Sequence, residues 1–387
     1  MIFSILIFLL VLSFLVLIHE LGHFLMARRF GIKVEEFGFG YPPRVLTLFT
    51  WKGIPFTLNA LPFGGFVRME GEDGSARREE PHSAKASRSK GKETMRVASH
   101  IEVDHSPFYT KTKLQRLIVI LAGATVNFLF GVLAFIVLFY CIGIPVSKTP
   151  PVVEQVFDGP AKTAGVQVGD VIEEVGKQGS VLKPAGELES FIRFVAHEPN
   201  TILILHIQRG TQTLDIPVHT RSARDIALGQ GALGVSLDQP VDFVHYAWYE
   251  MPFRSIVVGV QKSVDFSFTI VDTLESMIKN LVTFGMVPKD VAGPVGIVKE
   301  VNDQHIFDGG VLAILNFTAI LSINLAIMNV LPFPALDGGR AVLIILEAIV
   351  GRKRVAKVEG LVNTAGFALL LTLIVAITAK DIWTIFH

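Results

Sequence analysis

Residues 15–26, LVLIHELGHFLM, place two histidines and a glutamate inside an otherwise apolar run. Ionisable groups are costly to bury in hydrocarbon, so such residues normally serve a function. In an α-helix His19 and His23 are four positions apart and lie one above the other on one face, so both imidazoles can reach one metal ion. Glu20 is rotated off that face and can approach a water molecule beside the metal. The run therefore predicts a helix that carries half of a metal site.

Composition favours a membrane protein, because 50% of the 387 residues are hydrophobic and only 18% are charged. The net charge of zero offers no basic surface for nucleic acid, and a single cysteine, Cys141, excludes a multi-cysteine metal site. The first apolar segment lacks the basic start and cleavage site of a signal peptide, so we expect it to be retained. Four segments reach the roughly 20 residues needed to cross a bilayer: 2–27, 117–144, 311–332 and 361–378.

Basic residues at the segment ends predict the orientation. Arg28 and Arg29 close the first segment, and further lysines and arginines precede the second and separate the third from the fourth. The positive-inside rule therefore places 28–116 and 335–360 in the cytoplasm and 145–310 on the opposite side.

A third metal ligand is expected, because catalytic zinc usually takes three protein ligands and leaves one position for water. No further histidine lies in a membrane segment, which leaves Asp337, in NVLPFPALDGGR, as the candidate. The orientation rule places Asp337 at the same membrane depth as His19 and His23. A polar cluster that only holds helices together is the alternative, although three ionisable groups cost more than that role requires.

Three stretches between the segments have distinct patterns. Residues 37–72 alternate β-favouring runs with glycine and proline, which predicts hairpins buried against protein at the membrane. Within them we expect 56–59 to be an edge strand that pairs with an extended substrate, or else part of a sheet that only plugs the site. Residues 74–106 are polar and of low complexity, typical of a disordered linker. Residues 241–288 are amphipathic and predict helices at the membrane interface, with a fifth span as the alternative.

Residues 146–238 predict a separate soluble α+β domain of short strands and one amphipathic helix. Within this range, GPAKTAGVQVGDVI resembles the signature of bacterial-type PDZ domains. That resemblance implies a fold and leaves the ligand open.

Nearly the whole chain resembles the site-2 protease family of membrane-embedded zinc metalloproteases, in particular the bacterial branch that releases anti-sigma factors. The resemblance is carried by HELGH, LPFGGFVRM, AGATVNF, the PDZ-like domain, AGPVGIV and NVLPFPALDGGR, in the family's order. It implies one Zn²⁺ per chain with His19, His23 and Asp337 as ligands, Glu20 as the catalytic base and Asn329 as a substrate-binding residue.

Two points stay open within that resemblance. Asn127, in AGATVNF, is compatible with helix packing as well as with a catalytic role. Some members of the family carry two tandem PDZ domains, whereas 146–238 has room for one, so gating rules based on a tandem do not transfer.

The expected fold is a polytopic α-helical membrane protein of about four transmembrane helices, with a membrane-associated β-rich segment and one extracytoplasmic PDZ-like domain. The expected division is 1–36 (first transmembrane helix with HELGH), 37–72 (β-hairpin segment), 73–110 (cytoplasmic linker), 111–145 (second transmembrane helix), 146–238 (PDZ-like domain), 239–310 (amphipathic interfacial helices and loop), 311–340 (third transmembrane helix with LDG) and 341–387 (cytoplasmic connection and fourth transmembrane helix).

The expected function is intramembrane hydrolysis of peptide bonds within or near the transmembrane segments of single-span proteins, such as anti-sigma factors or signal-peptide remnants. The enzyme would reside in the bacterial cytoplasmic membrane, and its PDZ-like domain would bind substrate ectodomains or peptide C-termini. A non-catalytic zinc-binding scaffold that captures partners is the main alternative. A zinc transporter is a weaker one, because the other spans hold few polar residues.

Overall fold

The computed structural model describes residues 2–72, 106–147, 150–227, 231–284 and 293–386. The chain divides into two compact units, one made of Met1–Ala134 and Gly293–His387 and the other of Phe135–Ala292. Most of the predicted linker over 73–110 lies outside the described residues.

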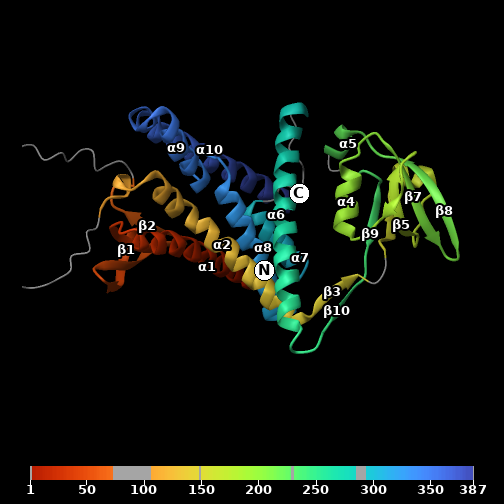
Figure 1. The fold of residues 1–387 in the computed structure, drawn as a ribbon, viewed down its shortest axis with the longest axis horizontal. Coiled ribbons are helices and arrows are strands. Elements are labelled where there is room, and N and C mark those ends of the chain that lie inside the picture. The colour runs from red at the N-terminus through yellow and green to blue at the C-terminus, as the bar shows by residue number, and fades with distance from the viewer. Residues whose placement is uncertain (1, 73–105, 148–149, 228–230, 285–292, 387) are drawn as a thin grey trace, which may run out of the picture. The chain divides into compact units, whose positions relative to one another are not determined.

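Long helices dominate the first unit (Figure 1). They are α1 (Ile2–Arg29), the first part of α2 (Lys113–Ile142), α7 (Pro294–Asp303), α8 (Gly310–Val330), α9 (Asp337–Val350) and α10 (Arg352–Phe386), with a short 3₁₀ turn, η3 (Ile306–Gly309), before α8. Among the described residues, four stretches are long and apolar enough to cross a membrane: Phe3–Arg29, Lys113–Ile142, Ile306–Val330 and Lys357–Trp383. These stretches overlap the four segments predicted from hydropathy, which confirms that prediction.

Helices α1 and α2 pack backbone against backbone. A Cβ atom at Gly22 would stand 2.6 Å from the carbonyl oxygen of Ala122 and 2.9 Å from the Cα of Gly123. Farther along, the rings of Phe14 and Phe130 meet with centroids 5.5 Å apart. Residue numbers therefore rise along one helix as they fall along the other, and small residues at the crossing permit the close approach.

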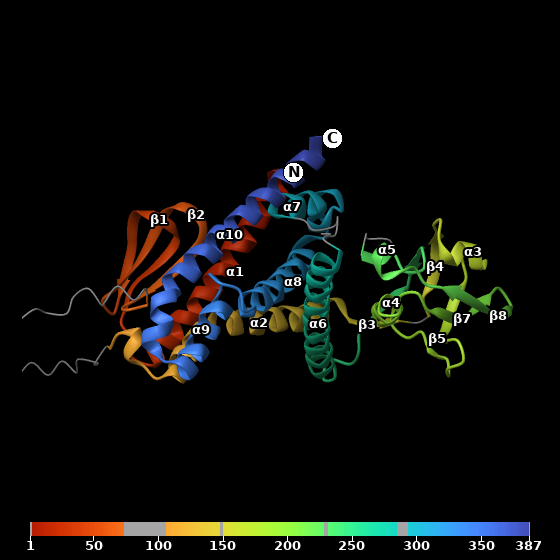
Figure 2. The ribbon, with the colours of Figure 1, turned by 90° about the horizontal axis from the view of Figure 1, so that it is seen from above.

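Strands β1 (Val34–Trp51) and β2 (Ile54–Met69) form a sheet beside α1 (Figure 2). Each strand folds back, so that Phe37 pairs with Phe56 on one side and with Val67 on the other. Phe56 in turn pairs with Phe49 as well as with Phe37. The prediction that 56–59 offers a free edge is therefore wrong, because both of its sides are already paired. The two strands thus provide four extended runs, which lie side by side in the order 44–51, 54–59, 34–39 and 65–69.

One buried carboxylate joins all four runs of this sheet. Glu36 is 4% exposed. It accepts a hydrogen bond of 2.7 Å from the Thr57 hydroxyl and pairs with Arg44 at 2.8 Å and Arg68 at 3.3 Å. Burial by itself would raise the pKa of Glu36, but the hydroxyl and the two guanidinium groups outweigh it and hold that pKa below its ordinary value. Glu36 is therefore ionised at neutral pH and fixes the shape of the sheet.

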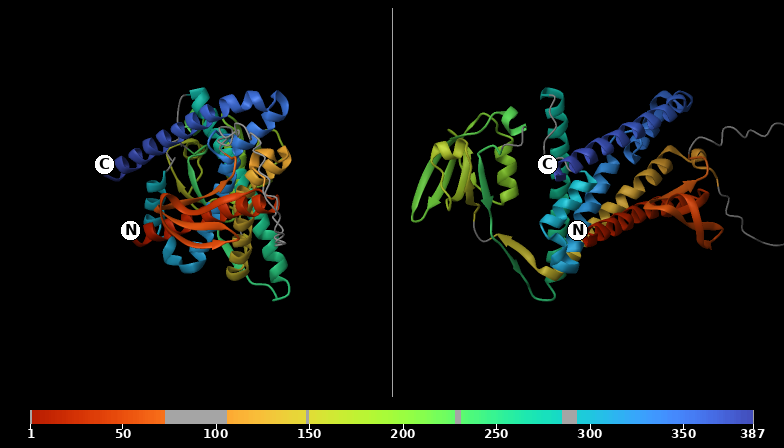
Figure 3. Two further views of the ribbon diagram at one scale, coloured as in Figure 1. Left: turned by 90° about the vertical axis from the view of Figure 1, so that its left-hand side faces the viewer. Right: turned by 180° about the vertical axis from the view of Figure 1, so that it is seen from behind.

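The second unit contains a sheet in the order β8-β7-β5-β4-β9, with β6 added to β5. A two-stranded ribbon of β3 (Ile144–Ser147) and β10 (Val241–Val244) lies between this sheet and the end of α2 (Figure 3). The sheet core centres on Phe191, Leu203 and Leu205, all fully buried. Its elements are β4 (Val152–Val156), α3 (Pro160–Ala164), β5 (Val171–Lys177), β6 (Lys183–Pro184), α4 (Leu188–Ala196), β7 (Ile202–Arg209), β8 (Gln212–His219), α5 (Ala223–Ala227) and β9 (Val235–Asp238).

The predicted interfacial segment over 241–288 is largely one helix, α6 (Met251–Phe284), of 34 residues. It is not among the candidate membrane spans. Within the second unit α6 lies along α4, through an ion pair of 2.6 Å between Lys262 and Glu189 and one of 3.6 Å between Arg193 and Asp272.

The expectation of a single transmembrane helix over 311–340 needs correction, because α8 ends at Val330 and Asp337 opens a separate helix, α9. Two glycines after Asp337 allow the first turn of α9 to fold against the loop before it. A Cβ atom at Gly338 would stand 2.2 Å from the carbonyl oxygen of Leu331, and one at Gly339 would stand 2.2 Å from that of Phe333. Asp337 is thereby held at a helix N-terminus by its own backbone surroundings.

Candidate metal centre

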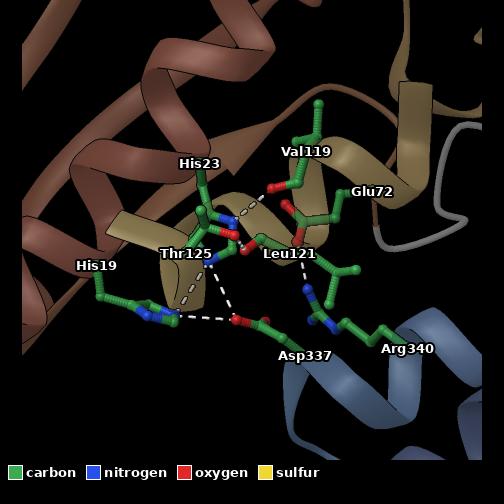
Figure 4. Close-up of polar contacts among 8 residues, drawn as sticks. All are labelled: His19, His23, Glu72, Val119, Leu121, Thr125, Asp337 and Arg340. Carbon is green, nitrogen blue, oxygen red and sulfur yellow. Dashed lines mark hydrogen bonds and ion pairs between the residues drawn. The ribbon is translucent and has the colours of Figure 1, made fainter. Parts of the chain in front are cut away.

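His19, His23 and Asp337 converge from two helices far apart in sequence (Figure 4). The Nε2 atoms of the two histidines are 3.1 Å apart, and Oδ2 of Asp337 lies 2.9 Å from Nε2 of His19 and 3.3 Å from Nε2 of His23. Both histidines are 8% exposed. The three residues predicted from sequence thus meet at one point.

This triangle has the dimensions of a zinc ligand set. Zinc holds nitrogen and oxygen ligands at about 2.0–2.1 Å in a tetrahedron, which places any two of them about 3.3–3.4 Å apart. The side of 3.3 Å matches that value, and the sides of 3.1 and 2.9 Å are shorter than it. The donor set, two imidazole nitrogens and one carboxylate oxygen, is also one that zinc prefers. The residues present therefore fit the metal.

The hydrogen bond on the far side of His23 supports the same conclusion. Its Nδ1 lies 2.8 Å from the carbonyl oxygen of Val119 in α2, an acceptor, so Nδ1 carries the proton. In the neutral ring the Nε2 lone pair then faces the carboxylate of Asp337, and two acceptors repel unless a cation lies between them. Nδ1 of His19, in contrast, is buried without a hydrogen-bond partner among the described residues.

A glycine of α2 makes room for the triad. A Cβ atom at Gly123 would stand 2.5 Å from Nε2 of His23 and 2.8 Å from Nε2 of His19. Any side chain at this position would press on both ligand nitrogens. The histidine pair therefore depends on the helix packed against it as much as on the helix that carries it.

Glu20 lies beside the triad without belonging to it. It is half-buried, and it is not one of the three residues whose ligand atoms cluster. Its Cγ stands 3.5 Å from the position of a Cβ atom at Gly65, in the outer run of β2. A carboxylate so placed, next to the ligands and against the edge of a sheet, suits a general base better than a metal ligand.

A further ion pair links the sheet to the Asp337 helix. Arg340, one turn after Asp337 in α9, donates to Glu72, which follows β2 (Figure 4). In the sequence, Arg340 served only as one of the basic residues that predict the orientation of the membrane segments. The pair ties the end of the sheet to the helix that presents the third ligand.

Asn329 is half-buried in the last turn of α8, eight positions before Asp337. The described residues give its side chain no hydrogen bond, so its predicted substrate contact stays a prediction. Sequence reasoning also missed Gly22, Gly123 and the Val119 carbonyl. The two glycines stand inside the quoted motifs HELGH and AGATVNF and were available as signals, whereas a backbone carbonyl has no sequence signature.

Comparison with known proteins decides the class of the molecule. The model of peptidase family M50 matches residues 7–373. The chain belongs to peptidase family M50. The zinc metalloprotease RasP of Geobacillus kaustophilus is 30% identical over 99% of this chain and 98% of its own length. RasP of Oceanobacillus iheyensis is 28% identical over 98% of both chains, and the chloroplastic membrane metalloprotease ARASP of Arabidopsis thaliana is 31% identical over 96% of this chain and 77% of its own.

Membership of the M50 peptidases, the site-2 proteases, establishes a membrane zinc metalloprotease that acts on membrane proteins. It confirms the expected family, enzyme class and cofactor, and it disfavours the zinc scaffold and the transporter. The four apolar helices agree with a lipid environment.

Proposed function

We propose that this M50 peptidase hydrolyses single-span membrane proteins within or near their transmembrane segments, with His19, His23 and Asp337 holding the zinc and Glu20 acting as the base. The observation that carries the proposal is the convergence of the three ligand atoms on a triangle of zinc dimensions beside a carboxylate that lies outside it.

Each residue then has a distinct task. Bound zinc supplies Lewis-acid chemistry, since it polarises a carbonyl and lowers the pKa of water to about 7. Glu20 takes the proton of the attacking water and later delivers it to the leaving amine. Asn329, in the α8 turn before the loop that leads to Asp337, is assigned to hold the substrate backbone. Because hydrolysis needs water, the site is assigned to the cytoplasmic end of the spans, where the basic residues gather.

The sheet supplies a place for the substrate backbone. A peptide bond inside a helix has its hydrogen bonds internally satisfied, so the substrate must unwind before it is cut. Residues 65–69 form an outer run of the sheet, and among the described residues no strand pairs with its outer side. Gly65 in this run lies against Glu20. An unwound substrate that adds to this edge regains backbone hydrogen bonds and is aligned with the base.

Proline substitutions across 65–68 should affect cleavage with a period of two. Proline removes one N–H donor, and along an edge strand alternate N–H groups point outward to the substrate or inward to the neighbouring run. Variants at the outward positions should keep the fold, and their cleavage of helical substrates should fall by roughly 5–10-fold, which corresponds to a lost backbone hydrogen bond of about 1–1.5 kcal/mol. Cleavage rates are compared for a helical substrate and for the same substrate with helix-breaking residues at the scissile site.

The opposite edge of the same sheet provides the matched control. Residues 45–48 belong to the other outer run, and they expose Val45, Leu46 and Leu48. Prolines there should leave the ratio of the two cleavage rates unchanged. If prolines at 65–68 either unfold the protein or slow both substrates equally, the sheet only fills space beside the zinc.

The soluble domain is assigned a selective role. Its strand and helix order, with GPAKTAGVQVGDVI around α3, supports the PDZ-like assignment to 146–238. On the positive-inside rule the domain lies across the membrane from the site, where it meets substrate ectodomains or newly cut C-termini. Anti-sigma factors in the bacterial cytoplasmic membrane are the substrate class that fits this arrangement.

The proposed function is tested with the purified protein and a panel of single-span substrates, incubated with and without a zinc chelator. Cleavage should map within or next to the transmembrane segment and should stop on chelation and return with added zinc. Cleavage confined to soluble loops, or unaffected by chelation, would contradict the proposal.

A further inference from the structure

Asn127 is a fully buried polar side chain with no partner. It is 0% exposed within the apolar helix α2, and neither its Oδ1 nor its Nδ2 makes a hydrogen bond among the described residues. Its backbone carbonyl is satisfied separately, by the Ser322 hydroxyl of α8 at 2.7 Å. An unpaired amide at membrane depth is costly, so a helix-packing role alone does not account for it.

The position of Asn127 on α2 points to the metal ligands. Val119, Gly123 and Asn127 follow one another at intervals of four and share one face of the helix. The first contacts His23 through its carbonyl, and the second lies under the histidine pair. Helical side chains lean toward the helix N-terminus, so we expect the amide of Asn127 to lie near the turn of Gly123.

The imidazole of His19, which packs against Gly123, lacks a hydrogen-bond acceptor for its Nδ1 among the described residues, in the same way that Asn127 lacks a donor. Cε1 of His19 stands 2.7 Å from the position of a Cβ atom at Gly123, and the neighbouring Nδ1 is buried without a partner. A histidine that binds metal through Nε2 carries its proton on Nδ1 and normally donates it to an acceptor. His23 has such an acceptor in Val119, and His19 lacks one.

We propose that the Asn127 amide oxygen is this acceptor, and that it receives the Nδ1–H of His19 through one bridging water. Asn127 is then a positioning residue, which fixes the His19 tautomer whose Nε2 lone pair faces the metal. One face of α2 thereby orients both histidines, His23 through a backbone carbonyl and His19 through a side chain. The inference rests on the proposed role of His19 as a zinc ligand.

The test measures zinc affinity of the purified full chain by competition with a chelator. Asn127→Leu keeps the size and removes the acceptor, and it should weaken zinc binding by about 10–100-fold. Asn127→Asp keeps an acceptor oxygen at this position and should bind zinc within about threefold of the parent. Ser322→Ala removes a buried hydrogen bond from the same helix contact without touching His19, and its zinc affinity should also stay within about threefold of the parent. The proposal is overturned if the leucine variant binds zinc as tightly as the parent. It is also overturned if the aspartate variant loses as much zinc affinity as the leucine variant, whether or not Ser322→Ala loses it too.

A second measurement needs no change at Asn127. In zinc-free protein labelled with ¹⁵N-histidine, His19 should show a single tautomer with the proton on Nδ1, and a spectrum with the proton on Nε2 or on both in exchange would overturn the proposal. A His19→Ala variant assigns the resonance and separates the two hypotheses. If that variant keeps its zinc, the ligand assignment itself fails; if it loses zinc while Asn127→Leu does not, only the role of Asn127 fails.

Discussion

Replacing Glu20 by glutamine should lower turnover by about 10²–10⁴-fold while the protein keeps its fold and its zinc. The amide has nearly the shape of the carboxylate but cannot accept a proton from water. Because Glu20 lies outside the cluster of ligand atoms, its charge is not needed to hold the metal. Cleavage is measured under single-turnover conditions with a single-span substrate, and zinc by elemental analysis.

Glu70→Gln is the matched control for this substitution. Glu70 follows the same sheet and pairs with Lys33 at 3.1 Å, on a more exposed part of the molecule. Its replacement removes an equal charge and should leave turnover close to that of the parent. Near-normal cleavage by Glu20→Gln would remove Glu20 from the role of base, and loss of zinc from that variant would make it a ligand instead.

The His19→Ala/His23→Ala double variant should lose its zinc altogether, from about one ion per chain to background. Asp337 alone cannot replace two imidazoles, and its carboxylate would stay near the emptied site without the histidine partners that it has now. Activity should vanish with the metal, and adding zinc should not restore it. Elemental analysis of folded protein, with the fold checked by circular dichroism, measures the effect.

His206→Ala serves as the control for histidine removal in general. His206 lies in β7 and pairs with Asp215 at 2.5 Å, in the other unit of the chain. This variant should retain full zinc. A double variant at His19 and His23 that still carries one zinc per chain would place the metal elsewhere.

Local periodicity was sufficient to predict the half-site in α1. His19 and His23 share a face in any helix, so five residues of sequence determine their geometry. Asp337 was predicted from chain topology and charge asymmetry, which are coarser signals. They predicted that Asp337 meets the two histidines, which the structure shows, but not its place at the start of α9, although Pro332 and Pro334 mark an interruption of the helix.

The edge of the sheet could not be found in the same way. Alternation in 37–72 indicates strands, but the order in which runs pair is set by contacts distant in sequence. The run 56–59 and the run 65–69 look equally suitable as edges, and only the pairing of Phe56 on both sides separates them. The support that α2 gives to the ligands was hidden for a related reason, since it acts through the carbonyl of Val119 and the absent side chain of Gly123.

The contact between Gly22 and Gly123 bears on attempts to transplant this chemistry. Grafting HELGH onto a helix of a designed membrane bundle would copy the two imidazoles but not the neighbouring helix that orients them. At an ordinary helix spacing of about 8–10 Å, a neighbour's carbonyl would fall short of His23, and a side chain at the facing position would occupy the space that the rings need. The smallest transferable unit is therefore a pair of helices crossing at two glycines, and a design that begins from the crossing can add the histidines afterwards.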